Sequence, residues 1–404
     1  MDPITCRPFR LDDAPGWTAL HRSHFPPLSD EAGLRWARRP DVTAAIAISG
    51  SQVVGAIPFH IRDFQINPRV TIRGAFEHAV IVAESMRDRG IGSQMMDAAR
   101  QFLAPQCDAL MVYRGGERSI GYRFYTKTGH HDLSYLRPYV LESPAPQPPQ
   151  KVSRSQRDLL LEREAEYDAV FRSAFGSFGG FRQRGPGYWA DAFSSAYFDM
   201  IPQEFVLLTL EEAGAIQGYG LLSREPQRRV HRCAHLLELA TRGGSAGLAR
   251  PLLREAMTVC AEWDTDLRAY SADHSPYAAL LVELGLRAVP RAESSMMTMA
   301  YVIDPAALGP RVWQENDEAA PLEVSVWTPQ REALIHPATC TTSKTVMLEM
   351  KEDTLTRLLF SRLDLRAAVR QELVTVVGGS EPDVDAIARA LPFAPWAYHH
   401  LDYI

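Results

Sequence analysis

Residues 77–103, EHAVIVAESMRDRGIGSQMMDAARQFL, contain the pattern that decides the fold of this chain. Residues 79–82 are apolar and mostly β-branched, as in a buried strand. A compact turn with glycines and arginines follows, and from Ile91 to Leu103 the apolar side chains recur at helical spacing. Such a turn exposes backbone N–H groups at the positive end of a helix dipole. The stretch therefore predicts a phosphate or pyrophosphate site.

The spacing in this turn is Arg-x-x-Gly-x-Gly, formed by Arg87, Gly90 and Gly92. A lone G-x-G often serves only to reverse the chain, and neither the dinucleotide fingerprint nor a G-x-x-x-x-G-K-[ST] loop occurs here. Directly after an apolar strand, however, this spacing resembles the acetyl-coenzyme A signature of the GNAT N-acetyltransferase superfamily. The resemblance implies that the pyrophosphate of acetyl-CoA, or of another acyl-CoA, is held by Arg87, Asp88, Arg89, Gly90, Ile91, Gly92 and Ser93.

Composition bounds the class of protein. A chain of 404 residues predicts two to three domains, and 46% hydrophobic with 23% charged residues is typical of a soluble globular protein. A net charge of −6 gives no general attraction to DNA or to anionic membranes, so we expect neither as a partner. The N-terminus lacks a signal-peptide core, which predicts a cytoplasmic protein. Five scattered cysteines without C-x-x-C spacing predict no disulfide framework, and we expect no metal.

A second motif lies downstream in the same segment. Residues 44–49 and 52–61 read as a hairpin, residues 71–82 as further sheet, and residues 109–113 as another strand. A short helix then ends at a glycine, with Tyr125 four residues before Gly129. This resembles the Tyr-x-Lys-x-Gly-Phe ending of the second GNAT signature, although here His130 replaces the aromatic residue.

A proline-rich linker, residues 143–150, precedes what reads as a second copy of the core. Strands over residues 205–210 and 217–222 are followed by a turn at residues 241–247 and a helix. The distance from Gly92 to Gly129 is 37 positions, and that from Gly247 to Gly285 is 38, as an internal duplication would give. In the second copy Ser245 stands in place of Gly90, and Leu281 in place of Tyr125. We therefore expect chemistry in the first copy alone. We also expect that a loop of the second copy faces the first site through Arg182, Arg184, Tyr188 and Trp189.

A third segment follows residue 304. Strands are expected at residues 322–327 and 345–350, and helices at 351–361, 364–371 and 384–391. The chain ends in the aromatic stretch FAPWAYHHLDYI, residues 393–404, which we expect to be packed rather than frayed because burial of its rings is favourable.

Taken as a whole, the chain resembles the Eis-type (enhanced intracellular survival) acetyltransferases. The resemblance implies an α+β fold with mixed sheets, in which two tandem GNAT-like domains precede a sterol-carrier-protein-like domain. The expected bounds are residues 1–142 for the catalytic domain, 143–152 for the linker, 153–304 for the degenerate GNAT-like domain and 305–404 for the last domain. Two departures stand out: Asp88 interrupts the arginine pair of the turn, and the chain ends in Ile404 where the family commonly has phenylalanine.

The chemistry of acyl transfer assigns expected roles. The backbone of Val80, Ile81 and Val82 would bind the pantetheine amides. Tyr125 would protonate the leaving thiolate, although a core aromatic would also fit that position. His78 is a candidate general base, and it could equally be structural. The Eis resemblance implies a second candidate, the C-terminal carboxylate of Ile404.

The acceptor side is less constrained by sequence. Candidate substrate-binding residues are Phe25, Trp36, Phe76 and Asp402, of which the three aromatic ones could equally be core. The expected reaction is transfer of an acyl group, most simply acetyl, from coenzyme A to a small amine in antibiotic modification or secondary metabolism, by a homo-oligomer. The Eis resemblance implies polyamine-like or aminoglycoside-like acceptors. One alternative is a carrier-protein thioester or an aminoacyl-tRNA as donor, bound by the arginine clusters Arg35, Arg38, Arg39 and Arg224, Arg228, Arg229. A second alternative is a non-enzymatic coenzyme A or lipid sensor.

Overall fold

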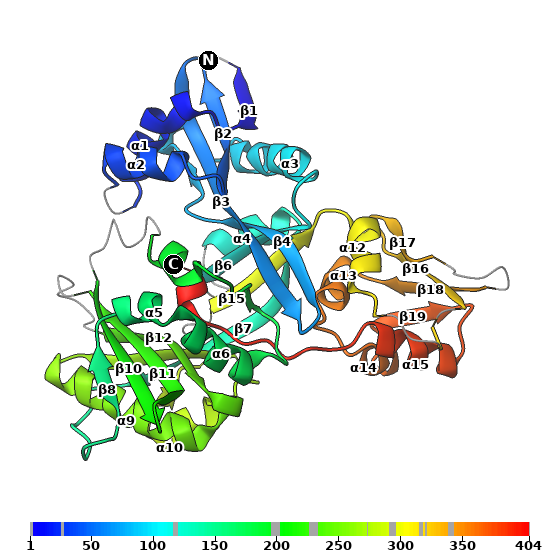
Figure 1. Ribbon diagram of the computed structural model, residues 1–404. Helices are drawn as coiled ribbons and strands as arrows, with labels where there is room; N and C mark the ends of the chain where they lie inside the picture. The colour runs from blue at the N-terminus through cyan, green and yellow to red at the C-terminus, as the bar shows by residue number, and fades with distance from the viewer. Residues whose placement is uncertain are drawn as a thin grey trace.

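The computed structural model describes residues 3–25, 28–115, 120–194, 203–225, 233–272, 274–290, 296–314, 318–319, 321–337 and 343–403. Three parts follow one another along the chain. Figure 1 shows the N-terminal unit at the top, the second unit at the lower left and the C-terminal domain at the right. The expected α+β class with mixed sheets and a tandem arrangement is confirmed.

The first unit has the strands and helices that the sequence predicts. Its hairpin has the expected register, with Ser49 opposite Gln52. The strands are β1 (Ile4–Pro8), β2 (Val42–Ser49), β3 (Gln52–Asn67), β4 (Val70–Glu77), β5 (Ile81–Val82) and β6 (Ala109–Gly115). The helices are η1 (Leu11–Asp13), α1 (Ala14–Arg22), α2 (Asp30–Ala37), η2 (Glu84–Met86), α3 (Ile91–Leu103) and α4 (Ile120–Lys127).

Helix α3 follows directly from its sequence pattern. The apolar positions at helical spacing, Ile91, Met95, Met96, Ala99 and Leu103, are all buried against the sheet. The intervening Gln94 and Asp97 are exposed. The helix is thus fixed by one apolar face, and its N-terminus is left at the surface.

One predicted strand is broken. The expected continuous strand through residues 79–82 is wrong, because β4 ends at Glu77 and β5 contains only Ile81 and Val82. Ala79 has a φ of 40°, which interrupts the extended backbone. The strand alternation that we used to place His78 and Val80 on one face therefore does not apply.

The second unit repeats the order of the first. Paired strands, a turn, a long helix, a strand and a short helix follow one another as expected. Strand β7 (His131–Leu141) completes the first unit. The strands of the second are β8 (Ser153–Ser155), β9 (Phe181–Arg182), β10 (Glu204–Glu212), β11 (Ala215–Arg224), β12 (Cys233–Thr241), β13 (Asp266–Ala272), β14 (Arg287–Ala288) and β15 (Met296–Val302). The helices are α5 (Asp158–Glu162), α6 (Glu164–Phe175), α7 (Tyr188–Phe193), η3 (Arg242–Gly244), α9 (Ala246–Glu262) and α10 (Ala278–Glu283).

The two units share one sheet. Its strand order is β1-β2-β3-β4-β6-β15-β7-β13-β12-β11-β10-β8, with β5 and β9 paired to β3 and β14 paired to β7. Strand β15 of the second unit thus lies beside β6 of the first, and β7 of the first lies beside β13 of the second. This exchange of strands holds the two units together through backbone hydrogen bonds, which sequence patterns do not predict.

The C-terminal domain contains a separate sheet of order β17-β16-β18-β19. The expected strands and helices are present, and β17 and β19 are additional. The strands are β16 (Leu322–Trp327), β17 (Glu332–His336), β18 (Lys344–Met350) and β19 (Val374–Val377), and the helices are α12 (Pro305–Val312), α13 (Glu352–Leu359), α14 (Leu365–Arg370), α15 (Glu381–Ala390) and η4 (His400–Tyr403).

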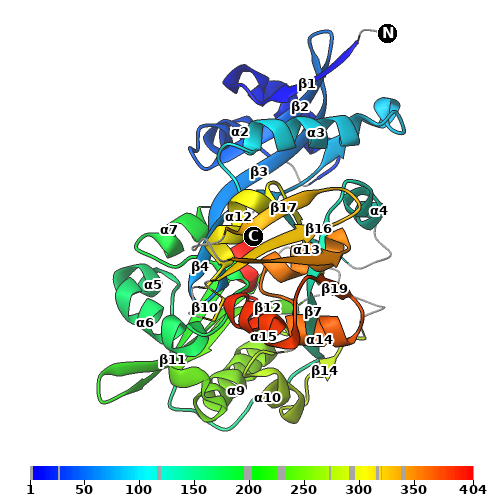
Figure 2. The same cartoon turned by 90° about the vertical axis from the view of Figure 1, so that its right-hand side faces the viewer.

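The aromatic C-terminal stretch is packed, as expected. From α15 it runs back into the middle of the molecule, where Figures 1 and 2 both show the C-terminus. Trp396 is 2% exposed and its Nε1–H donates to the carbonyl of Ile66 at 2.9 Å. Gly179 forms backbone hydrogen bonds with Pro395 and Ala397 on either side. The tail therefore ties the C-terminal domain to both other units.

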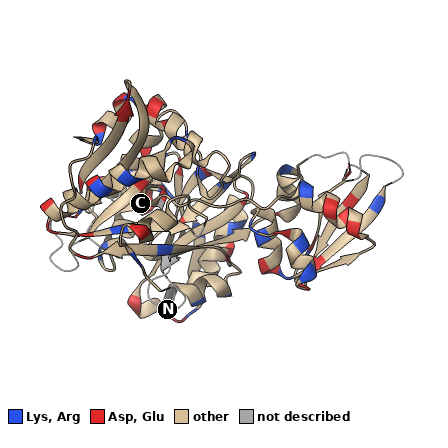
Figure 3. Ribbon diagram, turned by 90° about the horizontal axis from the view of Figure 1, so that it is seen from below, with Lys and Arg blue, Asp and Glu red and all other residues tan. Residues whose placement is uncertain are grey.

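Charged residues of both signs are interleaved over the molecule, as Figure 3 shows from below. In the described part of the chain, no helix is long and apolar enough to cross a bilayer.

Candidate active site

The turn before α3 has a free helix N-terminus. Gly90, at the N-cap, has a φ of 75°, and a Cβ added there would meet no atom within 4 Å. Gly92 allows α4 to approach closely, because an added Cβ would lie 2.9 Å from the ring of Phe124. Residues 87–90 are exposed. The first amides of α3 thus point to an open surface, which suits a pyrophosphate.

The two arginines of the turn lie against the chain that precedes it. Arg87 donates from Nε to the carbonyl of Val82 at 3.4 Å, and Arg89 donates from Nη2 to that of Ser85 at 3.1 Å. Both residues are exposed. Their positive charge therefore lies beside the free amides, where it adds to the attraction for an anion.

Strands β5 and β6 separate beside this turn. Strand β6 pairs with β15 along its whole length and with β4 only as far as Val112, whereas β5 pairs with β3. Among the described residues, β5 and β6 therefore have no pairing with each other. The amide of Ala83 donates to Val54 of β3 at 2.8 Å. Successive amides point to opposite edges, so the N–H of Val82 points away from β3 into the gap. An extended amide-bearing ligand can pair with this edge.

Tyr125 lies on α4 and is 7% exposed. Its ring makes an edge contact with His130, with centroids 5.4 Å apart. His130 Nε2 in turn lies 2.8 Å from Glu77 Oε1, and both side chains are fully buried. The two atoms are in close contact, although their geometry is not that of a well-aligned hydrogen bond. His130, which departs from the GNAT motif, thus fixes the loop after α4 to the end of β4.

His78 lies at the break between β4 and β5. Its amide donates to Pro58 at 3.0 Å, and its ring lies 4.5 Å from the ring of His60. The residue is partly exposed, but its Nε2 is buried without a hydrogen-bond partner. Burial, with a smaller contribution from Arg62, lowers the pKa of His78 to about 3. The imidazole is therefore neutral at pH 7, and it is a weak base in this state.

His60 and Arg62 lie next to His78 on one face of β3. Trp36 Nε1–H donates to His60 Nε2 at 3.0 Å, and Arg62 Nη2 lies 2.8 Å from His60 Nδ1. Burial, followed by the charges of His78 and of nearby arginines, lowers the pKa of His60 well below its usual value. Because Trp36 and Arg62 can only donate, a protonated His60 would face two donors. The ring is therefore neutral.

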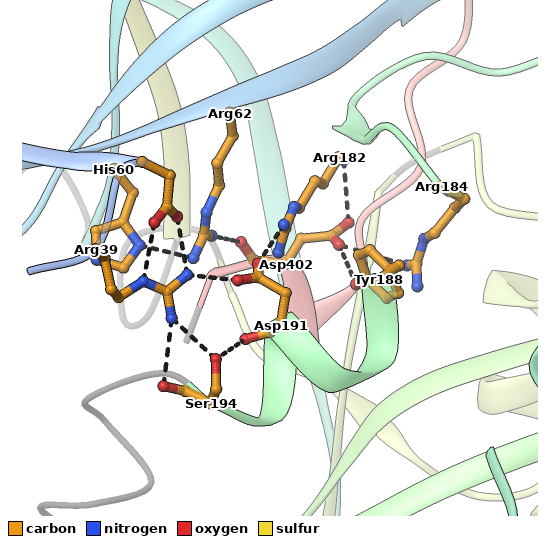
Figure 4. A network of polar contacts seen from close by, with 10 residues as sticks. Arg39, His60, Arg62, Arg182, Arg184, Tyr188, Asp191, Ser194 and Asp402 are labelled. Atoms are coloured by element: carbon orange, nitrogen blue, oxygen red, sulfur yellow. Dashed lines mark hydrogen bonds and ion pairs between the residues drawn. The ribbon is translucent and has the colours of Figure 1, made fainter. Parts of the chain in front are cut away.

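The C-terminal tail ends at this group (Figure 4). Arg62 Nη1 donates to the backbone carbonyl of Asp402 at 2.8 Å, and the carboxylate of Asp402 accepts from the Tyr188 hydroxyl. Arg184 lies 3.4 Å from the same carboxylate, and the amide of Arg182 donates to it at 3.3 Å. Asp402 is thus held by the loop that we expected to face the first site. Trp189, by contrast, is core.

A second group of charges connects α2 to α7. Asp191 accepts from both Arg39 and Arg182, as Figure 4 shows. Arg39 also pairs with Asp41 at 2.8 Å and donates to the Ser194 hydroxyl at 2.9 Å. These pairs hold the first unit against the second.

The other candidate residues are placed differently. Phe76 is 4% exposed and stacks on Tyr113, with centroids 5.5 Å apart, inside a core cluster. Phe25 is 40% exposed and lies against His21. The structure thus brings Trp36 and Asp402 to the group around His60, but not Phe25 or Phe76. Ile404 lies outside the described residues.

Of the six arginines expected to bind a macromolecular donor, Arg35, Arg39 and Arg224 have carboxylate partners within the chain. Arg39 belongs to the inner group just described, and Arg224 pairs with Glu204 at 2.7 Å. Arg35 and Arg38 remain on α2 and at its end. Arg228 and Arg229 lie outside the described residues.

Sequence reasoning missed His60, Arg62 and Asp191. A signal for two of them exists, because His60 and Arg62 are polar residues at alternate positions of a strand that is otherwise almost wholly buried. Asp191 has no such signal, since its partner Arg39 lies 152 positions away in the sequence.

Comparison with known proteins agrees with this geometry. Residues 11–130 match the acetyltransferase (GNAT) family. No curated protein matches the sequence. The structure is similar to those of a GCN5-related N-acetyltransferase from Kribbella flavida (15% identity, TM-score 0.67, covering 100% of this chain and 99% of that one) and of Eis1 from Mycobacterium abscessus (13%, 0.60, 98% and 99%).

A tandem GNAT protein from the clavulanic acid biosynthesis pathway also matches, with 16% identity and a TM-score of 0.50, covering 75% of this chain and 99% of that one. At these identities the likeness shows the fold alone. The family match adds that residues 11–130, the part of the chain with the turn and Tyr125, are similar in sequence to GNAT acetyltransferases. Enzymes of this family typically use acyl-CoA.

Proposed function

We propose that the first unit transfers an acyl group, acetyl in the simplest case, from coenzyme A to the amine of a small molecule. The observation that carries this proposal is the exposed N-terminus of α3 beside the unpaired edge of β5. One end of that arrangement suits a pyrophosphate and the other suits an amide-bearing arm. No metal is needed in this scheme.

In this scheme the donor lies along the gap between β5 and β6. The amides from Gly90 to Ser93 bind the pyrophosphate, with Arg87 and Arg89 beside them and Asp88, at a φ of 60°, shaping the turn. The backbone around Val82 pairs with the pantetheine arm. A backbone N–H of the same segment, residues 80–82, then polarises the thioester carbonyl.

Tyr125 is proposed as the general acid. When the amine attacks the thioester carbon, the tetrahedral intermediate collapses and the C–S bond breaks. The phenol of Tyr125 donates its proton to the departing thiolate, and the amide product remains. A phenol with the ordinary pKa of about 10 is un-ionised at neutral pH, as this step needs.

Two groups remain proposed for the base that removes the ammonium proton. His78 is neutral and has a free, buried Nε2, but its lowered pKa makes it a weak acceptor. The carboxylate of Ile404 follows a tail that reaches Arg62 through Asp402. The carboxylate is our preferred assignment, because its negative charge also attracts the ammonium form of the acceptor.

The finer assignments rest on the Eis resemblance and on this geometry together. We infer an Eis-type enzyme with a sterol-carrier-protein-like C-terminal domain, acting in the cytoplasm as a homo-oligomer on amines of antibiotic modification or secondary metabolism. The small four-stranded sheet with its helices supports the domain assignment. The bounds 1–142, 143–152, 153–304 and 305–404 remain our proposal. The first and third of these ranges exchange strands β7 and β15 in the shared sheet.

Titration of acetyl-CoA into the enzyme, followed by a screen of amines with a free-thiol readout, tests the proposal. We expect micromolar binding and thiol release that depends on an amine. Absence of acetyl-CoA binding would refute it. Binding without turnover of any amine would instead favour a coenzyme A sensor, and turnover only with a carrier-protein thioester or an aminoacyl-tRNA would move the donor to that class.

A further inference from the structure

A cavity of about 520 Å³ lies between β3 of the first unit and the 182–191 segment of the second. This volume is typical of a site for a small metabolite. Positive charge is concentrated in its wall, which contains the arginines Arg39, Arg62, Arg73, Arg182 and Arg184. The family resemblance led us to expect a polyamine-like or aminoglycoside-like acceptor, and a wall of this kind does not suit a ligand that carries only positive charge.

Four of the five arginines have carboxylate partners. The pairs are Arg39 with Asp41 and Asp191, Arg182 with Asp191, Arg73 with Asp63, and Arg184 with Glu238. Arg62 differs, because no carboxylate of the described residues lies within 4 Å of its guanidinium. Its two contacts are the backbone carbonyl of Asp402 and the ring of His60.

The hydrogen bonds of Arg62 are also incomplete. Its Nε–H is buried and has no partner. Its Nη2 faces Nδ1 of His60, while Trp36 donates to Nε2 of the same ring. A neutral imidazole has one acceptor nitrogen and one N–H, so it cannot accept from both neighbours. The Nε–H of Arg62 is therefore left without an acceptor among the described residues. If the acceptor nitrogen of His60 is used by Trp36, an Nη2–H of Arg62 lacks an acceptor as well.

The charge of Arg62 is balanced only from a distance, by the carboxylates of Asp191 and Asp402. The residue is 5% exposed, and burial together with repulsion from Arg182 lowers its pKa to about 10. It is still a cation at neutral pH. A buried cation without an anionic partner is costly, and an anion that enters the cavity removes that cost.

We propose that Arg62 binds a carboxylate of the acceptor in this cavity, so that the acceptor is an amine that also carries a carboxylate, such as an amino acid. The inference deepens the proposed function and rests on it. A guanidinium fork matches the two oxygens of a carboxylate. The aspartates Asp41, Asp63 and Asp191 in the same wall disfavour a phosphate dianion, which they would repel more strongly than a monoanion.

The cavity also lies on the side of the first unit from which an acceptor can reach the donor gap between β5 and β6. Arg62 contacts His60, and the ring of His60 lies 4.5 Å from that of His78. His78 directly precedes the 79–82 segment that borders the donor gap. A small acceptor held by its carboxylate at Arg62 can therefore extend its amine toward the thioester.

Matched pairs of amines that differ only in the α-carboxylate test the proposal: ornithine with putrescine, lysine with cadaverine, and tyrosine with tyramine. We expect the carboxylate-bearing member to have a kcat/KM at least about ten-fold higher, the effect of one good charged contact. Titration of ornithine and putrescine into the enzyme without acetyl-CoA gives the same comparison independently of turnover.

Variants assign the preference to Arg62. In Arg62→Gln we expect KM for the carboxylate-bearing amine to rise about ten-fold or more, with little change in kcat and none in KM for its partner amine. Arg62→Lys should recover part of the loss. Asp191→Asn removes the carboxylate that Arg39 and Arg182 share. In this variant KM for the carboxylate-bearing amine should fall several-fold, a gain that loss of structure would not produce. The control Arg287→Gln, at a site 61% exposed and outside the cavity wall, should match the wild type.

Three results would overturn the proposal: preference for the amines without carboxylate, an equal loss for both members of each pair in Arg62→Gln, or no binding of any carboxylate-bearing amine. Failure of the proposed function is distinguishable from these, because it would appear as loss of acetyl-CoA binding by the wild-type enzyme.

Discussion

The two turns that precede α3 and α9 occupy equivalent places in the duplicated units, and they differ in what satisfies their polar groups. Before α3, the N-cap Gly90 has no side chain, and the surrounding residues are exposed. Before α9, Ser245 caps Leu248, the Ser173 hydroxyl accepts from Gly243, and the Tyr277 hydroxyl accepts from Thr241. The second turn bonds to the protein itself, whereas the first leaves its amides for a ligand.

The gaps beside the two turns differ in the same way. In the first unit, β5 and β6 separate without a strand between them in the part of the chain that the structure describes. In the second, only about 40 Å³ of free space remains between β12 and β13, and its wall includes the tail residues Ala397, Tyr398 and His399. The two units thus have similar strand arrangements, and the C-terminal tail fills the gap between the strands of the second. This difference is why we assign chemistry to the first unit alone.

The largest expected effect separates the two tyrosines that lie near these turns. Tyr125→Phe removes the proposed acid, so kcat should fall about 100- to 1000-fold while acetyl-CoA affinity stays within a factor of two. The matched change Tyr277→Phe removes only the acceptor of Thr241, so it should cost about 1–2 kcal/mol of unfolding free energy and leave kcat unchanged. Steady-state kinetics and denaturant unfolding measure both. A kcat near wild type in Tyr125→Phe would remove its catalytic role.

A pair of glycines tests the turns directly. Gly90 and Gly243 have φ values of 75° and 63°, and an added Cβ meets no atom within 4 Å at either. Asp at position 90 would bond to the free amides and repel the pyrophosphate, so Gly90→Asp should weaken acetyl-CoA binding about 100-fold. Gly243→Asp should have the same backbone strain without a change in affinity. Isothermal titration with both variants checks this, and equal losses would mean that both turns bind the donor.

The tail in the second gap makes a pH prediction. His400 stacks on Tyr270 and His235, and its pKa is lowered to about 3 by burial and then by His235 and Arg268. In the unfolded chain His400 binds a proton near pH 6.5, whereas in the folded chain it stays neutral down to about pH 3. Below about pH 6.5 the unfolding free energy should therefore fall as pH falls, by at most about 1.4 kcal/mol per unit for this group, down to about pH 3.

Chemical unfolding between pH 7 and 4 measures this slope. His400→Gln should reduce it, whereas His274→Gln, at an exposed position, should not. An unchanged slope in His400→Gln would mean that the tail leaves the second gap in acid before unfolding, and the comparison between the two gaps would then hold only near neutral pH.

The sequence predicted what depends on local pattern. Helix α3 and its turn follow from residue spacing, and so do the β2–β3 hairpin and the glycine after α4. What it could not predict depends on long-range pairing. The break at Ala79, the exchange of β7 and β15, and the contact of Arg62 with Asp402, 340 positions away, arise from tertiary packing. The turn and helix that we propose for the donor could therefore be predicted from the sequence, and the surroundings that we propose for the acceptor could not.

The smallest expected effect compares two serines beside the turns. Ser245 accepts from the amide of Leu248 at the start of α9, so Ser245→Ala should cost about 1 kcal/mol of stability. Because this turn holds no ligand, acetyl-CoA should stabilise the variant and the wild type by the same increment. Ser93→Ala should change the unliganded stability little and should instead reduce the increment that acetyl-CoA provides, since its amide and hydroxyl lie in the proposed pyrophosphate site. Thermal unfolding with and without acetyl-CoA separates the two cases. A ligand-dependent increment altered by Ser245→Ala, and not by Ser93→Ala, would reverse the assignment of donor site and structural copy.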